Sequence, residues 1–288
     1  KVTTQLSPAV ADGLQAQAKV HQLTPFMLLH GALALVLSRH SNSRDIVIGT
    51  PVANRLQAEL EPLIGFFVNT LVLRLNTGYE VLDDYLAHVR RVHLDAQANQ
   101  DVPFEQLVES LNISRSSGHT PLFQIMLTTE TDFGLGTDSE VSLPGINAEL
   151  LPPAAVAAKF DLDIKIKFNE SGISLDWTYD KSLFTCTSIE RLNEHLCRLL
   201  TALAEMPEQA VVCRVSELPL LSPAEEEHLV YGLNETSSDY TRGLCIHELF
   251  EAQAAENPDK LALVFAGQRL TYGELNEQAN RIAAYLLE

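Results

Sequence analysis

The clearest pattern along the chain is a strict alternation of apolar and polar residues between positions 160 and 179. Every second residue from Phe160 to Phe168 is apolar, and the same period returns from Ile173 to Tyr179 after a turn at 169–172. Successive side chains of a strand point to opposite faces of a sheet. The pattern therefore predicts a β-hairpin with one buried face and one exposed face.

Three further segments, 45–51, 63–75 and 121–129, are rich in β-branched and aromatic residues and are predicted to be strands. In the second of them, apolar residues occupy both faces. One face carries Phe67, Asn69, Leu71 and Leu73, and the other carries Phe66, Val68, Thr70, Val72 and Arg74. A strand that is apolar on both faces is expected inside a sheet that is covered on both sides.

Helical periodicity predicts helices over 24–39, 81–92 and 104–111. A capping box from Thr187 to Glu190 predicts the start of another helix, which buries Leu192, Leu196, Leu199 and Leu203. Towards the C-terminus the chain is expected to form a helix over 246–256, a strand over 261–265, a turn at Gly267, and a last helix that begins at a second capping box, Thr271 to Glu274.

Two stretches lack a lasting period. Residues 130–158 are rich in glycine, proline and acidic residues, and this length suggests an element that crosses to a neighbouring part of the protein. Residues 207–242 contain only a short acidic helix after Ser222-Pro223, and they are interpreted as an interdomain linker.

Composition narrows the possible functions. With 46% hydrophobic residues the chain can form a core, and a net charge of −18 argues against a nucleic acid partner. The four cysteines lack Cys-x-x-Cys spacing, which favours reduced thiols, no metal site and a cytoplasmic location. The most apolar run, 26–37, is far shorter than the roughly 20 residues that span a membrane, so no membrane partner is expected. Lys1 does not open a secretory signal, and both ends look like cuts through a longer protein.

Familiar catalytic motifs are missing from the sequence. There is no Gly-x-Ser-x-Gly elbow and no phosphate loop ending in Gly-Lys, and the segment His247 to Glu251 has Glu where a zinc motif needs its second His. His88 and His93 are five residues apart on one predicted helix, so they do not share a face and are interpreted as ordinary helix histidines.

Three strings in fixed order do carry a resemblance. Residues 63–74, LIGFFVNTLVLR, resemble the IGxFVNTxxxR core motif of the condensation domains of nonribosomal peptide synthetases. Residues 99–105, NQDVPFE, are similar to the family's H/N-Q-D-x-P-F-E motif, and residues 115–123 resemble its RxxSxxPLF motif. The match departs from the family pattern at Ser116, Gly118 and Thr120.

A fourth string near the C-terminus, LTYGEL at 270–275, is similar to the first core motif of adenylation domains. A condensation lobe followed by an adenylation start is the module order of a nonribosomal peptide synthetase. The resemblance implies an α/β fold with a mixed sheet, the C-terminal lobe of the chloramphenicol-acetyltransferase-like condensation fold, followed by a partial adenylation segment. The implied domains are a condensation lobe at 1–206, a linker at 207–242 and a truncated adenylation start at 243–288.

The resemblance also suggests residues that line the substrate channel or form its motifs: Asn69, Arg74, Asn99, Gln100, Asp101, Arg115 and His119. Two of these assignments have a structural alternative. The Asn69 amide, set among apolar residues, needs hydrogen bonds worth about 1–3 kcal/mol and could simply pin the backbone. Residues 99–101, just before Pro103, could form a helix-capping turn.

The family's catalytic signature, HHxxxDG, does not occur in the sequence, so the chain alone is expected to be inactive and to bind no cofactor. By resemblance, the parent enzyme would form amide bonds between carrier-bound substrates, using phosphopantetheine on the carrier proteins and ATP with Mg²⁺ in the adenylation domain. The implied partners are the missing N-terminal condensation lobe, donor and acceptor carrier proteins, and the rest of the adenylation domain. The alternatives are an epimerisation or cyclisation domain of the same superfamily, or a noncatalytic module that binds carrier proteins.

Overall fold

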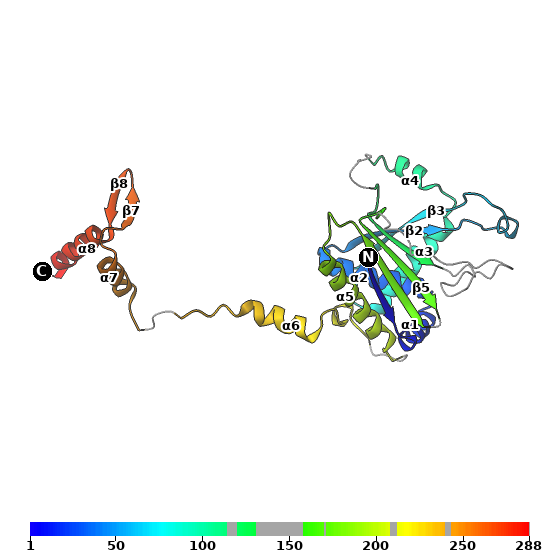
Figure 1. The fold of residues 1–288 in the computed structure, drawn as a ribbon, viewed down its shortest axis with the longest axis horizontal. Helices are drawn as coiled ribbons and strands as arrows, with labels where there is room; N and C mark the ends of the chain where they lie inside the picture. Colours follow the sequence, from blue (N-terminus) through cyan, green and yellow to red (C-terminus); the bar gives the residue numbers. More distant parts are fainter. Residues whose placement is uncertain (114–119, 131–157, 170, 208–211, 240–242, 288) are drawn as a thin grey trace, which may run out of the picture. The chain divides into compact units, whose positions relative to one another are not determined.

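The computed structural model describes residues 1–113, 120–130, 158–169, 171–207, 212–239 and 243–287. The chain divides into two compact units, Lys1–Glu226 and Glu227–Glu288, and many of their elements are labelled in Figure 1. The crossing element expected at 130–158 lies almost wholly outside the described residues.

The first unit is built on one six-stranded mixed sheet. Its strands are β1 (Val2–Leu6), β2 (Asp45–Val52), β3 (Asn69–Asn76), β4 (Ile125–Glu130), β5 (Leu162–Asn169) and β6 (Gly172–Tyr179). Their order across the sheet is β1-β6-β5-β4-β2-β3. The strand β4 runs parallel to both of its neighbours, β2 and β5, while the other pairs are antiparallel. The expected α/β fold with a mixed sheet is confirmed.

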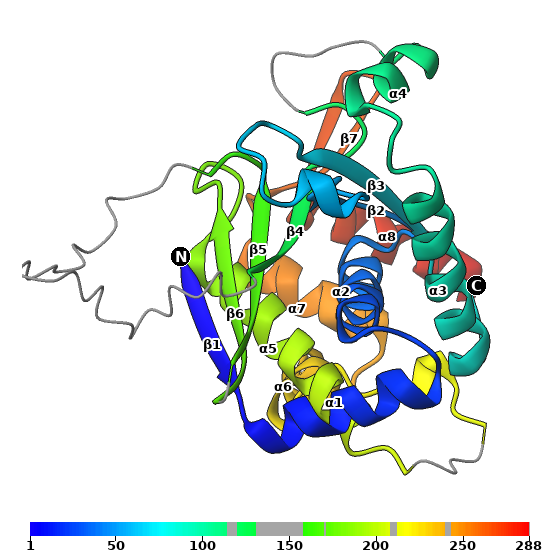
Figure 2. The ribbon, with the colours of Figure 1, turned by 90° about the vertical axis from the view of Figure 1, so that its right-hand side faces the viewer.

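Four helices cover one side of this sheet, as Figure 2 shows. They are α1 (Pro8–Val20), α2 (Pro25–Ser41), α3 (Leu82–Ala98) and α5 (Cys186–Ala204). The core between helices and sheet includes Trp177, Ile164 and Leu199, all fully buried. Two shorter helices, η1 (Ala58–Leu60) and α4 (Phe104–Ser110), lie in the connections around β3.

The hairpin predicted from the alternating pattern is confirmed as β5 and β6, which pair in register from Leu162 opposite Tyr179 to Asn169 opposite Gly172. The strand β6 is more buried than the pattern implied, because β1 covers its other edge. Even Asp176 is buried there, where it accepts a hydrogen bond from Thr3 Oγ1 at 2.6 Å.

The strand predicted at 63–75 is partly wrong. The strand β3 begins only at Asn69, and the residues before it form a surface connection in which Ile64 and Phe66 are 104% and 94% exposed. In the described part of the sheet β3 is an edge strand and is not enclosed on both sides. An apolar segment is more stable when it is buried. Its composition does not tell whether another element of the same chain covers it.

The predicted helices are confirmed, with one correction at a helix start. The side chain of Thr24 caps α2 by accepting a hydrogen bond from the Met27 N–H at 3.2 Å. The N-cap of α5 is Thr185, two residues before the predicted Thr187, and its Oγ1 accepts from the Ser188 N–H at 3.2 Å. The leucines expected on the buried face of this helix are buried.

The region expected to be a linker begins by packing on the first unit. Val215 and Leu218 are buried in that unit's core, and the Arg39 guanidinium donates to both of their carbonyl groups. The 3-10 helix η2 (Val215–Glu217) and the predicted acidic helix α6 (Pro223–Val230) follow. The first compact unit thus reaches Glu226, whereas the domain boundaries at 206 and 242 remain predictions.

The second unit contains small elements that match the expected pattern. They are η3 (Gly232–Asn234), α7 (Ile246–Glu256), β7 (Leu261–Phe265), β8 (Gln268–Thr271) and α8 (Tyr272–Leu287). Gly267 makes the β7–β8 turn with a φ of +81°. The predicted capping box is present, since Thr271 N–H donates to the Glu274 carboxylate and Glu274 N–H donates back to Thr271 Oγ1.

No single helix in the described part of the chain is long and apolar enough to cross a membrane, and one pair, α1 with α2, passes on length and composition only as a unit bent by 99°.

Candidate functional site

The side chain of Asn69 joins two segments that are more than thirty residues apart in the sequence. Its Nδ2 donates hydrogen bonds to the carbonyl oxygens of Gln100, at 2.8 Å, and Val102, at 2.7 Å. Its Oδ1 accepts a hydrogen bond from the Phe104 N–H at 3.2 Å. One amide at the start of β3 therefore holds the whole turn that leads into α4. We call these contacts the Asn69 junction.

The junction also caps the N-terminus of α4. The first N–H groups of a helix have no partner within the helix, and a side chain at the N-cap usually supplies one. The N-cap residue here is Pro103, which makes no side-chain cap. Asn69 supplies that cap from a distant strand, so the geometry of the turn depends on where β3 begins. Asn69 thus does what its structural alternative predicts, since its side chain holds the backbone of residues 100–104 in place.

The three neighbouring residues predicted as site residues behave differently from one another. Asn99 is the C-cap of α3 and donates from Nδ2 to the Asp95 carbonyl at 2.8 Å, so it caps the preceding helix and not the start of α4, where the sequence pattern places the capping turn. Gln100 is half-buried and takes part in the junction through its backbone carbonyl. Asp101 is exposed. Their role in a substrate channel stays a prediction.

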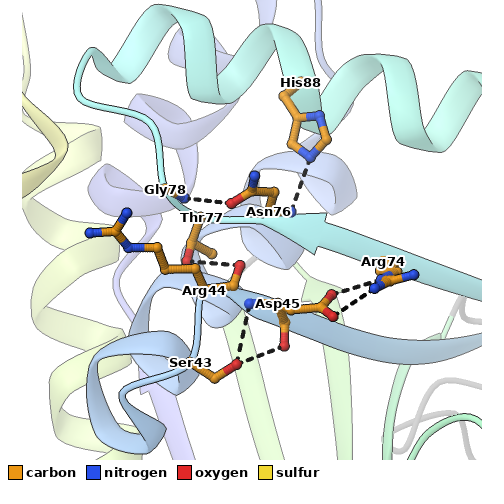
Figure 3. Close-up of polar contacts among 8 residues, drawn as sticks. All are labelled: Ser43, Arg44, Asp45, Arg74, Asn76, Thr77, Gly78 and His88. Atoms are coloured by element: carbon orange, nitrogen blue, oxygen red, sulfur yellow. Dashed lines mark hydrogen bonds and ion pairs between the residues drawn. The ribbon is translucent and has the colours of Figure 1, made fainter.

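Arg74 lies away from the junction, at the other end of β3. Five residues of strand separate it from Asn69, which corresponds to roughly 17 Å. Its Nε and Nη2 donate to the two carboxylate oxygens of Asp45, both at 2.8 Å (Figure 3). The hydrogen bond to Arg74 lowers the pKa of Asp45, and the same bond raises the pKa of Arg74. The structure therefore separates Arg74 from the other motif residues, and Arg115 and His119 lie outside the described residues.

Sequence reasoning missed an aromatic row that continues from the junction across the sheet. The Phe104 ring meets the Phe123 ring edge-on with centroids 5.7 Å apart, and Phe123 contacts Phe160 at 5.6 Å. Phe123 lies directly over Gly49 of β2, where an added Cβ would come within 2.3 Å of the ring. The signals in the sequence were the phenylalanines of the two motifs and the glycine inside a strand.

Buried histidines were also missed. His30 Nδ1 and His93 Nε2 lie 2.8 Å apart in the core, where both rings are at most 3% exposed. Burial lowers the pKa of His93 to about 4, and burial together with the His93 ring lowers the pKa of His30. The sequence pattern predicts an ordinary helix histidine at His93, and it marks its partner His30 only as a polar residue inside the most apolar run of the chain.

A second histidine chain anchors α6. His40 Nε2 lies 2.8 Å from His195 Nδ1, and His195 Nε2 lies 3.0 Å from the Glu225 carboxylate. The Glu225 carboxylate also accepts from the Ser222 N–H at 2.8 Å, and these bonds lower the pKa of Glu225 to about 2. The chain of contacts connects α2, α5 and α6 within the first unit.

Comparison with known families now identifies the fold. The family described as condensation domain matches residues 1–230. The chain belongs to the condensation domain family. Residues 250–288 match a second family, described as AMP-binding enzyme. The order expected from the motifs, a condensation region followed by an adenylation region, is confirmed by these two matches.

The relatives of this condensation domain chain are very large synthetases. It is 40% identical over 99% of its length to tyrocidine synthase 3 of Brevibacillus parabrevis, of which it covers 4%. It is 38% identical to malpinin synthetase of Mortierella alpina, of which it also covers 4%, and 37% identical to a dimodular nonribosomal peptide synthase of Bacillus subtilis, of which it covers 12%. The chain thus spans only a small part of each curated relative.

Solved structures show the same fold. A four-domain nonribosomal peptide synthetase bound to AMP and glycine matches 99% of the chain with a TM-score of 0.74 and 23% identity, and the match covers 22% of that protein. The X-domain from teicoplanin biosynthesis matches 76% of the chain with a TM-score of 0.67 and 26% identity, and the match covers 49% of that domain. The first condensation domain of the CDA synthetase is covered to 48%, with a TM-score of 0.58 and 21% identity. In the two single-domain matches, roughly three quarters of the chain, 76% and 77%, corresponds to about half of the solved domain.

Proposed function

We propose that the first unit is the C-terminal lobe of an amide-forming condensation domain and provides one wall of its substrate channel. The observation that carries this proposal is the Asn69 junction. It ties the segment that resembles IGxFVNTxxxR to the segment that resembles the NQD motif, and so it makes one rigid surface out of two motif segments. The half-coverage of solved condensation domains supports a second lobe as its partner.

In the proposed reaction, the amine of an acceptor aminoacyl group attacks the carbonyl carbon of a donor thioester. The new C–N bond forms, the C–S bond breaks, and the proton of the amine ends on the released phosphopantetheine thiol. The sequence lacks HHxxxDG, so the residues of this chain would act by holding the two substrates in register, while the acid–base chemistry comes from the N-terminal lobe. Donor and acceptor carrier proteins are the remaining partners in this proposal.

The second unit is proposed to begin an adenylation domain that uses ATP with Mg²⁺ to activate an amino acid. Its match to an AMP-binding family supports this, as do the apolar side chains that it leaves on its surface, among them Phe265 at 75% and Ile282 at 62% exposure. The proposal includes a cytoplasmic location, in keeping with four free cysteines.

The proposal is tested by amide formation between carrier-bound substrates, followed by mass spectrometry. The 288-residue chain alone is expected to give no product. The same chain joined to the upstream half of a condensation domain of tyrocidine synthase 3 is expected to give product. Asn69→Ala should then lower the rate about tenfold through loss of positioning, and the matched Asn169→Ala, at an exposed position at the end of β5 outside the motifs, should leave the rate within about twofold. Turnover by the chain alone, or equal rates for both variants, would count against the proposal.

A noncatalytic protein-binding role is the second candidate, and one observation favours it. The X-domain that matches this chain is described in a complex with OxyB, so a domain of this fold can serve as a partner surface. If this role holds for the present chain, a carrier protein should be retained by the immobilised chain, and the joined two-lobed domain should form no amide. Amide formation by the joined domain would leave the first candidate as the function.

A further inference from the structure

A polar cavity of about 580 Å³ lies at the end of β2 and β3, next to α3. Its lining comprises Arg44, Asp45, Arg74, Asn76, Gly78 and His88, which Figure 3 shows together. This end of β3 is the one that carries Arg74, so the cavity is separate from the Asn69 junction. None of the motif roles accounts for it.

One backbone–backbone hydrogen bond and two bonds from backbone N–H groups to side chains hold the walls of the cavity in place. The Thr77 N–H donates to the Arg44 carbonyl at 2.8 Å, and the Gly78 N–H donates to Asn76 Oδ1 at 2.9 Å. The Asn76 N–H donates to His88 Nε2 at 3.1 Å, which ties the turn to α3. The turn after β3 is therefore fixed to β2 on one side and to α3 on the other. A ligand that enters the cavity meets a turn backbone and an Asn76 side chain that are already held in place, which lowers the entropy cost of binding.

The charged groups of the cavity do not cancel. The two bonds between Arg74 and Asp45 neutralise both of those side chains. The Arg44 side chain instead packs against Gly78, and a Cβ added to Gly78 would lie 3.1 Å from Arg44 Cδ. Within the described residues, the Arg44 guanidinium has no hydrogen bond or ion pair. Arg91 adds a further positive charge behind the lining, with Nη2 3.0 Å from His88 Nδ1. Burial and Arg91 together lower the pKa of His88. A positive excess is therefore concentrated here in a chain of net charge −18.

We propose that this cavity binds a phosphate group, held by the Arg44 guanidinium and by the side-chain Nδ2 of Asn76. An arginine presents its N–H groups as a planar fork that matches two phosphate oxygens. Asn76 Oδ1 is engaged by Gly78, so its Nδ2 is left to donate to a ligand. Because Arg74 and Asp45 neutralise each other, Arg44 and Arg91 leave two positive charges near the cavity. These charges suit a phosphate monoester, which carries a charge of about −1.5 to −2 at neutral pH. The site stands on its own geometry and does not depend on the proposed condensation activity.

The test is calorimetric titration of the 288-residue chain with inorganic phosphate. Arg44→Gln should weaken binding about tenfold, since a charged donor is lost. Asp45→Asn should tighten binding about threefold or more, because Arg74 is released from its carboxylate. Arg198→Gln removes an equal charge from an exposed position on α5 and should stay within about twofold of the unchanged chain. The fluorescence of Trp177 during urea unfolding checks that each variant is folded.

Separate titrations identify the source of the phosphate. 4′-Phosphopantetheine and AMP are compared with inorganic phosphate, and pantetheine without its phosphate serves as the negative control. Binding of any phosphate probe that Arg44→Gln weakens and Asp45→Asn strengthens supports the site, and the probe that binds most tightly names the ligand class. The proposal is overturned if no phosphate probe binds, if pantetheine binds as well as its phosphate, or if Arg44→Gln matches Arg198→Gln.

Discussion

The two units of the chain contain the same kinds of element but differ in what those elements bury. In the first unit Trp177 and Leu199 are fully enclosed between the helices and the sheet. In the second unit, Ala254 is the buried apolar residue among those described, while Phe265 and Ile282 are 75% and 62% exposed. Most of the helices and strands that the local sequence predicts are formed in both units, the start of β3 being the main exception. The comparison shows that local signals are enough to start an element, whereas a core needs several elements from the same chain.

The sharpest test of this comparison shortens one apolar side chain in each unit. Leu199→Ala should destabilise the first unit by about 2–5 kcal/mol, since it removes buried methyl groups and leaves a void. Ile282→Ala, on the exposed face of α8, should change the stability by no more than about 0.5 kcal/mol. Urea unfolding of the first unit is followed through Trp177, which is the only tryptophan of the chain and lies in that unit, and the stability of the second unit is followed by hydrogen exchange at the amides of α8. A large loss from Ile282→Ala would mean that the second unit has a core that the structure does not show.

The Asn69 junction tests whether the first unit depends on contacts between distant segments. Asn69→Ala removes three hydrogen bonds and should cost about 1–3 kcal/mol. The Phe104 amide loses its acceptor in this variant. The rate of its hydrogen exchange should therefore rise by at least the factor that corresponds to the lost free energy of unfolding. Asn99→Ala is the matched control and should have a small effect, since Asn99 is exposed and its side chain bonds within its own turn. Equal effects of the two variants would contradict the clamping role.

The corrected cap of α5 gives a smaller and cleaner test. Thr185→Ala should cost the first unit about 0.5–2 kcal/mol, because the Ser188 N–H loses its acceptor. Thr187→Ala, at the position that the sequence pattern favoured, should be nearly neutral. A reversal of this order in urea unfolding would restore the predicted capping box.

The buried histidine pair gives the smallest expected effect, and it concerns pH. The folded-state pKa of His93 lies at about 4, below the ordinary value of 6.5 that applies to the unfolded chain. Below pH 6.5 the unfolded chain therefore binds a proton that the folded chain refuses, so stability is full above that pH and is lost as the pH falls towards 4. Between pH 6.5 and pH 5.5, the His93 effect should lower the free energy of unfolding by about 1 kcal/mol. His93→Leu should flatten this part of the pH profile in urea unfolding, and an unchanged slope would show that the pair is not the source.

Much of the fold could be predicted because its signals are local. Alternation over 160–179, the caps of α2 and α8, and the leucine face of α5 involve residues within a few positions of each other, and each prediction matched the structure apart from the cap of α5. The strand start at Asn69 could not be predicted, because the residues before it are as apolar as those after it. What differs is the availability of a neighbouring strand, which is a property of the whole sheet.

The sequence by itself determined most of the segments that become helices or strands, and its motifs indicated the family. Only the tertiary structure decided which polar residues meet: Asn69 with the turn at Gln100, Arg74 with Asp45, and His30 with His93. The physical reason is range. Backbone periodicity and caps act over a few residues, whereas a side-chain hydrogen bond acts over about 3 Å in space between residues that the chain places at any separation.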